Sequence, residues 1–380
     1  ILMDVTLRPW NTPDGAPVLA AERVEFNLSA LAALRGGVEF SSARLTRPTL
    51  VVARGPAGLY LPARPGGGRM ADAIDAARAV VAAKPEAPNT ADLPANPFGT
   101  IEVSDGRVIA LAGASQDEIV TGLTGQLTWA ALNRAATLSA KGIWRGEAAS
   151  LEVSSPAPLL LLAGASAPLK FALTAAPATA GFDGTLALGD KPFFQGQATV
   201  SAPSLRRVLE WSRSDVTTGA TIGSIAVSSR LTGDAARVKF ENTEITLDGN
   251  PGMGALELSL TEKVPTISGT LAFDPLDLRS LLSAFMPLDP AGNMTREIDA
   301  GFANRIDLDL RLSAGHATAG SIAMDDVAAT AQVKGGLAAF DISDATAFGG
   351  TIQAGVRFDR KAEGTQVELL HPAFFSIQQA

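Results

Sequence analysis

The chain of 380 residues contains no cysteine, only two histidines and one tyrosine. The absence of cysteine excludes a disulfide framework, a cysteine-ligated zinc site and a cysteine nucleophile. Its 31 Lys and Arg residues are scattered and the net charge is -8. Nucleic-acid phosphates require clustered cations, so this charge pattern argues against a nucleic-acid partner. Composition therefore predicts no metal, no cofactor and no nucleic acid.

Long apolar runs are also missing. The longest one, residues 158–165, is shorter than the ~20 residues that a helix needs to cross a bilayer. The first residues do not have the pattern of a signal peptide, and the chain opens inside a strand pattern. We therefore expect a sequence truncated at both ends, with an anchor that preceded it in the full-length protein.

Period-2 alternation of apolar and polar residues dominates what is present. Residues 306–312, 256–260 and 169–173 place their apolar side chains on one face and polar ones on the other. Turn signals such as 104–106, 247–249 and 334–336 separate such segments. The pattern predicts a mainly β fold, with roughly twenty strands in an elongated, curled and mainly antiparallel sheet.

Helices are few. Residues 69–84 carry Met70, Ile74, Ala77 and Val81 at helical spacing, and a proline-rich linker follows them. Two short helical turns share a pattern, in which Pro203 and Pro275 each precede a Leu-Arg pair. A sheet must cover its apolar face, and these helices are too few to do so. A second sheet, closure into a barrel, or a groove filled by apolar ligands would each supply the missing cover.

The order of these segments resembles that of the AsmA family of Gram-negative envelope proteins. Residues 3–62 resemble its N-terminal module, and residues 98–153 resemble its recurring strand-Asp-Gly-strand element around Asp105 and Gly106. Residues 301–358, with Phe348-Gly349-Gly350, are similar to its C-terminal signature. The resemblance divides the chain into 1–63, a β module; 64–98, helix and linker; 99–300, a central groove segment; 301–370, a second β module; and 371–380, an unassigned tail.

The resemblance implies a protein of the periplasm, held at the inner membrane by a helix that precedes this sequence. It implies an apolar β-groove for phospholipid transfer between the inner and outer membranes, support of outer-membrane assembly, and further envelope partners. The residues that would line the groove are Ile306, Leu308, Leu310, Leu312, Leu256, Leu258, Leu260, Leu169, Phe171 and Leu173.

Other functions remain open at this stage. The alternative to a lipid groove is a β-solenoid or sandwich that acts as an adhesin or structural binding module without lipid cargo. We expect no enzyme, because His316 and His371 have no cysteine partner and Asp307 and Asp309 fit the wet face of a strand. Trp129, Trp144 and Trp211 are residues that either pack in the fold or meet lipid headgroups.

Overall fold

The structure is a computed structural model that describes residues 1–8, 17–28, 40–55, 58–60, 68–112, 115–189, 192–212, 223–261, 264–285, 306–361 and 364–376. It contains two compact units, which are described separately. Unit 1 comprises Ile1–Ala176 and Gly181–Phe193, and unit 2 comprises Pro177–Ala180 and Phe194–Ala380. The five segments that we expected from the sequence follow the family resemblance, whereas the two units follow the compactness of the fold. The five segments therefore stay a prediction.

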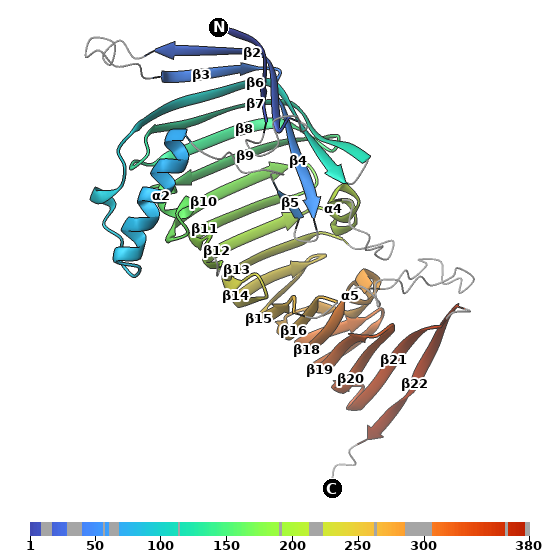
Figure 1. Cartoon of the computed structure of the whole chain (residues 1–380). Coiled ribbons are helices and arrows are strands. Elements are labelled where there is room, and N and C mark those ends of the chain that lie inside the picture. Colours follow the sequence, from blue (N-terminus) through green and yellow to red (C-terminus); the bar gives the residue numbers. More distant parts are fainter. Residues whose placement is uncertain are drawn as a thin grey trace. The chain divides into compact units, whose positions relative to one another are not determined.

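The described residues of unit 1 form strands and a few helical segments (Figure 1). Its helices are α2 (Gly68–Ala83), the short 3-10 helix η1 (Thr90–Asp92) and α3 (Pro158–Leu162). Its strands are β1 (Leu2–Leu7), β2 (Leu19–Leu28), β3 (Phe40–Thr46), β4 (Thr49–Gly55), β5 (Gly58–Tyr60), β6 (Pro97–Ala112), β7 (Ser115–Ala131), β8 (Ala136–Trp144), β9 (Glu147–Ser155), β10 (Ser166–Ala175) and most of β11 (Thr179–Ala187).

Unit 2 has the same character, and its described residues include the short helices α4 (Leu205–Ser212) and α5 (Leu278–Phe285). Its strands are most of β12 (Phe193–Ala202), β13 (Ile225–Asp234), β14 (Arg237–Leu247), β15 (Asn250–Ser259), β16 (Thr266–Phe273), β17 (Leu276–Asp277), β18 (Asp307–Ala319), β19 (Ile322–Lys334), β20 (Leu337–Ala347), β21 (Gly350–Lys361) and β22 (Gly364–Ser376). The mainly β fold class with a few short helices is confirmed. β22 ends at Ser376 and therefore includes residues 371–376 of the tail that we left unassigned from the sequence.

Strand pairing departs from the expected antiparallel pattern at four places among the described strands. β3 and β4 both pair in parallel with β6, and β16 and β17 pair in parallel with β18. The physical reason is the same at both sites. A parallel neighbour requires a crossover, and the chain supplies one through α2 and its linker in unit 1 and through α5 in unit 2. The other described pairs that follow chain order, such as β6 to β10, are antiparallel.

The packed end of unit 1 lies where α2 and α3 meet the sheet. Ala73 and Ala77 of α2 are buried against Trp129 and against Leu159 of α3. Proline at the start of α3 fits the helix, since the first turn needs no N–H there. The Trp129 indole donates a hydrogen bond of 3.0 Å to the Arg134 carbonyl, so its one polar group is satisfied. Of the three tryptophans considered from the sequence, Trp129 is therefore a core residue.

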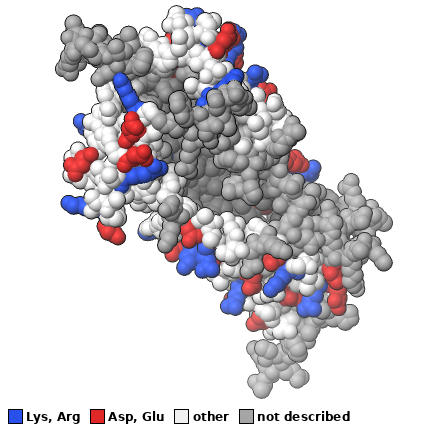
Figure 2. Space-filling model, viewed as in Figure 1, with Lys and Arg blue, Asp and Glu red and all other residues white. Residues whose placement is uncertain are grey.

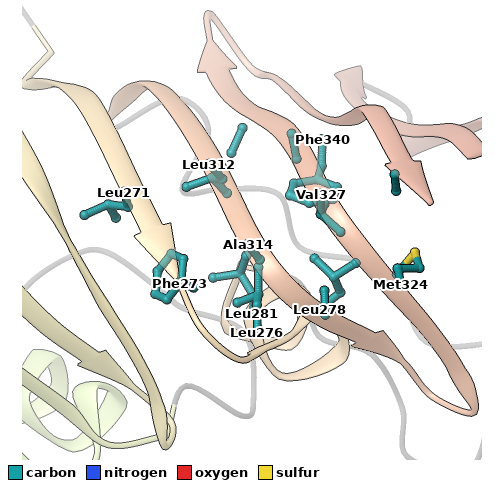
Figure 3. Packing of buried hydrophobic residues seen from close by; sticks show 14 of the residues in the cluster. Leu271, Phe273, Leu276, Leu278, Leu281, Leu312, Ala314, Met324, Val327 and Phe340 are labelled. Carbon is teal, nitrogen blue, oxygen red and sulfur yellow. The ribbon is translucent and has the colours of Figure 1, made fainter. Parts of the chain in front are cut away.

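The core of unit 2 gathers side chains from β16, β18, β19 and β20 around α5 (Figure 3). Leu278 and Leu281 of α5 point to this cluster, and Leu276 lies beside them. Asp248 and Asn250 fix the helix start, because Ser280 donates to the Asp248 carboxylate and the Asp277 amide donates to Asn250 Oδ1, each at 2.7 Å. α5 and α4 confirm the two short helices that the Leu-Arg pairs predicted.

The Phe348-Gly349 turn joins β20 to β21 in two residues, with Ala347 opposite Gly350. Both central residues are left-handed, with φ of 52° at Phe348 and 77° at Gly349. This is the geometry of a type I′ turn, which favours Asn followed by Gly.

We expect Phe348→Asn to raise the free energy of unfolding by about 1 kcal/mol, because the phenyl ring is 78% exposed and its backbone is strained. Gly349→Val should lower it by ~1–2 kcal/mol, since a β-branched side chain opposes positive φ. Urea unfolding of both variants measures these changes. A destabilised Phe348→Asn protein would show that the ring makes a contact that outweighs its strain.

Candidate functional site

The apolar face of unit 1 holds a hollow of about 300 Å³ between β7 and β10. This volume lies at the lower end of small-molecule sites, which span about 300–1,000 Å³. Gly142, Lys141 and Ser150 contribute to its lining. The apolar residues around it are Val120, Leu123, Ala140, Trp144, Ala149, Leu151, Phe171 and Leu173.

Strand register explains why these side chains meet. Ala140 lies opposite Leu151, which in turn lies opposite Leu173, so one apolar row crosses β8, β9 and β10. Gly142 and Ala149 face each other in the next row. Their side chains are small or absent, so the sheet surface is lowered there and the space stays open. Lys141 and Ser150, at the alternate positions, belong to the opposite face.

The groove residues expected in unit 1 divide between two environments. Phe171 and Leu173 are half-buried and line the hollow. Phe171 also stacks on Phe182 of β11, with ring centroids 6.2 Å apart. Leu169, two residues earlier, packs instead on the core that α2 and α3 build. The hollow therefore begins where those two helices stop covering the sheet.

The groove residues expected in unit 2 also divide. Leu310 and Leu312 are 7% and 6% exposed and belong to a dry core. Ile306, Leu308, Leu256 and Leu258 are half-buried. Leu260 is exposed and lies just beyond β15.

These residues belong to apolar rows that cross neighbouring strands. In one such row, each residue lies opposite the next in the order Leu258, Ile267, Leu308 and Val333. The rows are continuous, but burial rises from β15 toward β18, β19 and β20. Among the described residues, the half-buried side chains lie nearer β15, where Leu256, Ile267 and Leu308 pack at the margin of the core.

Six lining residues of the unit 1 hollow were missed as groove candidates from the sequence. They are Val120, Leu123, Ala140, Ala149, Leu151 and Trp144. Trp144 was considered only for packing or headgroup contact. The others lie in segments such as 147–153, where small and polar residues weaken the alternation. The pairing of β8 with β9 brings Ala140, Ala149 and Leu151 together. The sequence feature that could have indicated this pairing is the tight turn at Arg145 and Gly146, both of which have positive φ.

The structure places Asp309, one of the polar residues considered for chemistry, on the exposed face of β18. Asp309 accepts a hydrogen bond of 3.4 Å from Gln332 on the neighbouring strand and is exposed, as a wet sheet face requires. Within the described part of the chain, no group of His, Asp and Glu side chains could hold a metal ion. His371 lies where side chains are not described.

His316 forms an exposed charged pair with Asp274, at 3.0 Å between Nδ1 and Oδ1. The hydrogen bond to Asp274, then its negative charge and those of Asp325 and Asp326, raise the pKa of His316 above its ordinary value. The protonated form is therefore favoured in the folded protein. The stabilisation is fully present below the unfolded pKa of about 6.5 and is lost as pH rises through the higher folded value.

We expect Asp274→Asn to lower the pKa of His316 toward its ordinary value. An NMR titration in a His371→Gln background measures one imidazole alone. Asp344→Asn, a carboxylate on the same unit and outside the pair, is the matched control. An unchanged His316 titration in Asp274→Asn would contradict the proposed source of the shift.

Charge is mixed over the surface. Figure 2 shows Lys and Arg side chains interspersed with Asp and Glu over the described residues of that face, without a broad area of either sign. None of the helices in the described ranges has both the length and the apolar character needed to span a membrane.

Comparison with known proteins gave no match to a family model, to a curated protein or to a solved structure.

Proposed function

We propose that this chain is the periplasmic part of an AsmA-like envelope protein that holds phospholipid acyl chains on the apolar face of its sheet. In this role it transfers phospholipid between the inner and outer membranes and supports outer-membrane assembly. It acts by binding rather than by catalysis. The full-length protein is anchored to the inner membrane.

The observation that carries the proposal is the hollow between β7 and β10. Phe171, Leu173 and Leu151 are apolar side chains that stay half-buried there, although a core of the same unit lies two residues away at Leu169. Leaving apolar area in water costs about 25 cal/mol for each Å². Acyl chains would remove that cost without needing any directional contact.

The order of the sequence segments supports the same role. Residues 3–62, 98–153 and 301–358 resemble AsmA proteins, and the last range contains the Phe348-Gly349 turn described above. The half-buried residues Leu256, Leu258 and Leu308 extend the apolar surface within unit 2. A row that crosses several strands suits an extended chain better than a compact ligand.

Native mass spectrometry of the purified protein tests the proposal directly. We expect phospholipid to co-purify and to be exchanged when vesicles of phosphatidylethanolamine and phosphatidylglycerol are added. A folded protein that carries no lipid and takes none from vesicles would sink the proposal.

A pair of photo-crosslinkers on β10 locates the lipid. Phe171 faces the hollow and Ala172, the next residue, is exposed on the other face. We expect a crosslinker at 171 to capture phospholipid and one at 172 to capture none. Equal capture at both positions would mean that lipid adheres to the surface without using the hollow.

One observation favours the alternative, a structural binding module without cargo. Leu310, Ala331 and Phe340 form one row and are each less than 10% exposed, so this part of unit 2 is an ordinary core. If that module were the whole function, crosslinkers at 171 and at 308 would both capture protein only.

A further inference from the structure

The polar face of unit 2 carries a trough of about 670 Å³ that crosses β12, β13, β14, β15 and β16. Each strand contributes two outward side chains and the residue between them, such as Glu244, Ile245 and Thr246 on β14. The in-between residue points to the opposite face, so it adds only backbone to the trough. Two rows of side chains therefore flank a backbone floor.

The first row follows the register of the strands. Ser228 lies opposite Glu244, which lies opposite Met253, which lies opposite Ala272. Thr199 of β12 also lines the trough on this side. Four strand spacings of about 4.8 Å give the row a length of about 19 Å.

The second row consists of Ser201, Ala226, Thr246, Pro251 and Asp274. Thr179 extends it, because its hydroxyl and that of Ser201 are 2.7 Å apart. The side chains of this row are small, which leaves the floor open. The backbone groups of the floor are already used in the β ladder, so a peptide strand could not pair with them.

The chemistry of both rows selects the class of ligand. Among the described residues that line the trough there is no Lys or Arg, and Glu244 repels anions, whereas the charge of Asp274 is paired with His316. Five hydroxyl side chains line the trough. Thr179 and Ser201 bond to each other and Ser228 accepts from Gln197, but a hydroxyl can donate one hydrogen bond and accept two, so each keeps capacity for a ligand. Met253, which is 66% exposed, lies beside Pro251 and Ala272 and offers apolar contact. A neutral molecule with many hydroxyls and apolar C–H faces matches all three properties.

Unit 1 repeats this construction on its own polar face. A trough of about 360 Å³ crosses β7 to β10, and its two rows run through Gln126, Ser139 and Glu152 and through Thr128, Thr137 and Ser154. Hydroxyl and amide groups again dominate, but Glu152 is accompanied by Lys170 of β10, whose ammonium group pairs with Asp183 at 3.1 Å. The unit 1 trough therefore contains a cation that the unit 2 trough lacks.

We propose that the unit 2 trough binds a neutral glycan strand, laid across the strands of the sheet. The site is separate from the apolar face, because alternate residues of the same strands serve the two surfaces. It does not depend on the proposed lipid role.

Isothermal titration of the protein with the tetramer of N-acetylglucosamine tests the proposal. Ala226→Trp places an indole in the unit 2 trough. Ala255→Trp places the same group on an exposed outward position of β15, outside the trough. We expect binding with Kd of about 1 mM or tighter, at least ~tenfold weaker binding in Ala226→Trp, and unchanged binding in Ala255→Trp.

Phospholipid content, measured on the same samples, separates this proposal from the lipid role. It should be equal in both tryptophan variants and the native protein. Absence of glycan binding by the native protein would overturn the glycan proposal alone. Equal binding in Ala226→Trp and Ala255→Trp would overturn it too, as would a preference for an anionic polymer such as heparin over the neutral tetramer.

Discussion

Replacing Leu312 by Asp is expected to unfold unit 2, or to lower its free energy of unfolding by about 3–5 kcal/mol. Leu312 is 6% exposed and lies between Leu271 on β16 and Ala329 on β19. A carboxylate placed there has neither water nor a cation, and burying an unpaired charge is costly. Urea unfolding followed by circular dichroism measures the loss.

Ser313→Asp is the matched control, because it adds the same charge one residue away on the exposed face. We expect a change of less than about 0.5 kcal/mol for it. Leu173→Asp is a second comparison, since this residue is half-buried beside the unit 1 hollow. It should leave the protein folded and reduce its lipid content. A stable Leu312→Asp protein would show that β18 faces solvent or ligand, and the core assigned to it would be wrong.

Filling the unit 1 hollow is expected to remove most lipid from that unit. Ala149 lies opposite Gly142 and contributes only a methyl group to the lining. Ala149→Trp would place an indole in the space that we assign to acyl chains, and an occupied hollow cannot bind them. We expect lipid captured from a crosslinker at Phe171 to fall at least ~tenfold, a change of about 1.4 kcal/mol in binding. Mass spectrometry of the crosslinked product gives the captured amount.

Ala148→Trp provides the control, since Ala148 is exposed and is the neighbouring residue on the same strand. Its lipid capture should match that of the native protein, and both variants should keep the native circular dichroism spectrum. If Ala149→Trp is folded and still captures lipid at position 171, the lipid does not occupy the hollow.

Sequence alternation was sufficient to predict the strands and their two faces. In 306–312 the apolar residues share a face in the structure, as period 2 requires. Alternation could not tell which apolar faces are covered. Leu312 and Leu173 have similar neighbours in sequence, yet one is in a dry core and the other lines a hollow. The difference arises from α5, which packs on β18, whereas α3 stops at the residues beside Leu169.

Strand order was the second property that local pattern could not supply. Nothing in the residues of β3 or β16 marks them as partners of a parallel strand. Neither is the continuous apolar run that is typical of parallel sheets, and side chains alternate between the two faces of a strand whichever way its neighbour runs. The choice depends on where α2 and α5 return the chain to the sheet. The hollow was missed for a related reason, since Gly142 and Ala149 matter only once β8 and β9 are paired.

The parallel pairs also set the order in which the chain can fold. Strands β6 to β10 pair with their neighbours in sequence, so each hairpin closes a short loop and forms early. β3 reaches β6 only across a wide gap, as the Arg44 and Glu102 side chains that bond there are 58 positions apart. Closing that loop costs more chain entropy before any contact stabilises it. On the nascent chain, β3 can pair with β2 at once, but its partner on the other edge, β6, is made much later. The edge of β3 and β4 that pairs with β6 must therefore stay free of wrong pairings until β6 has been synthesised, a period in which a chaperone that binds extended segments would protect it.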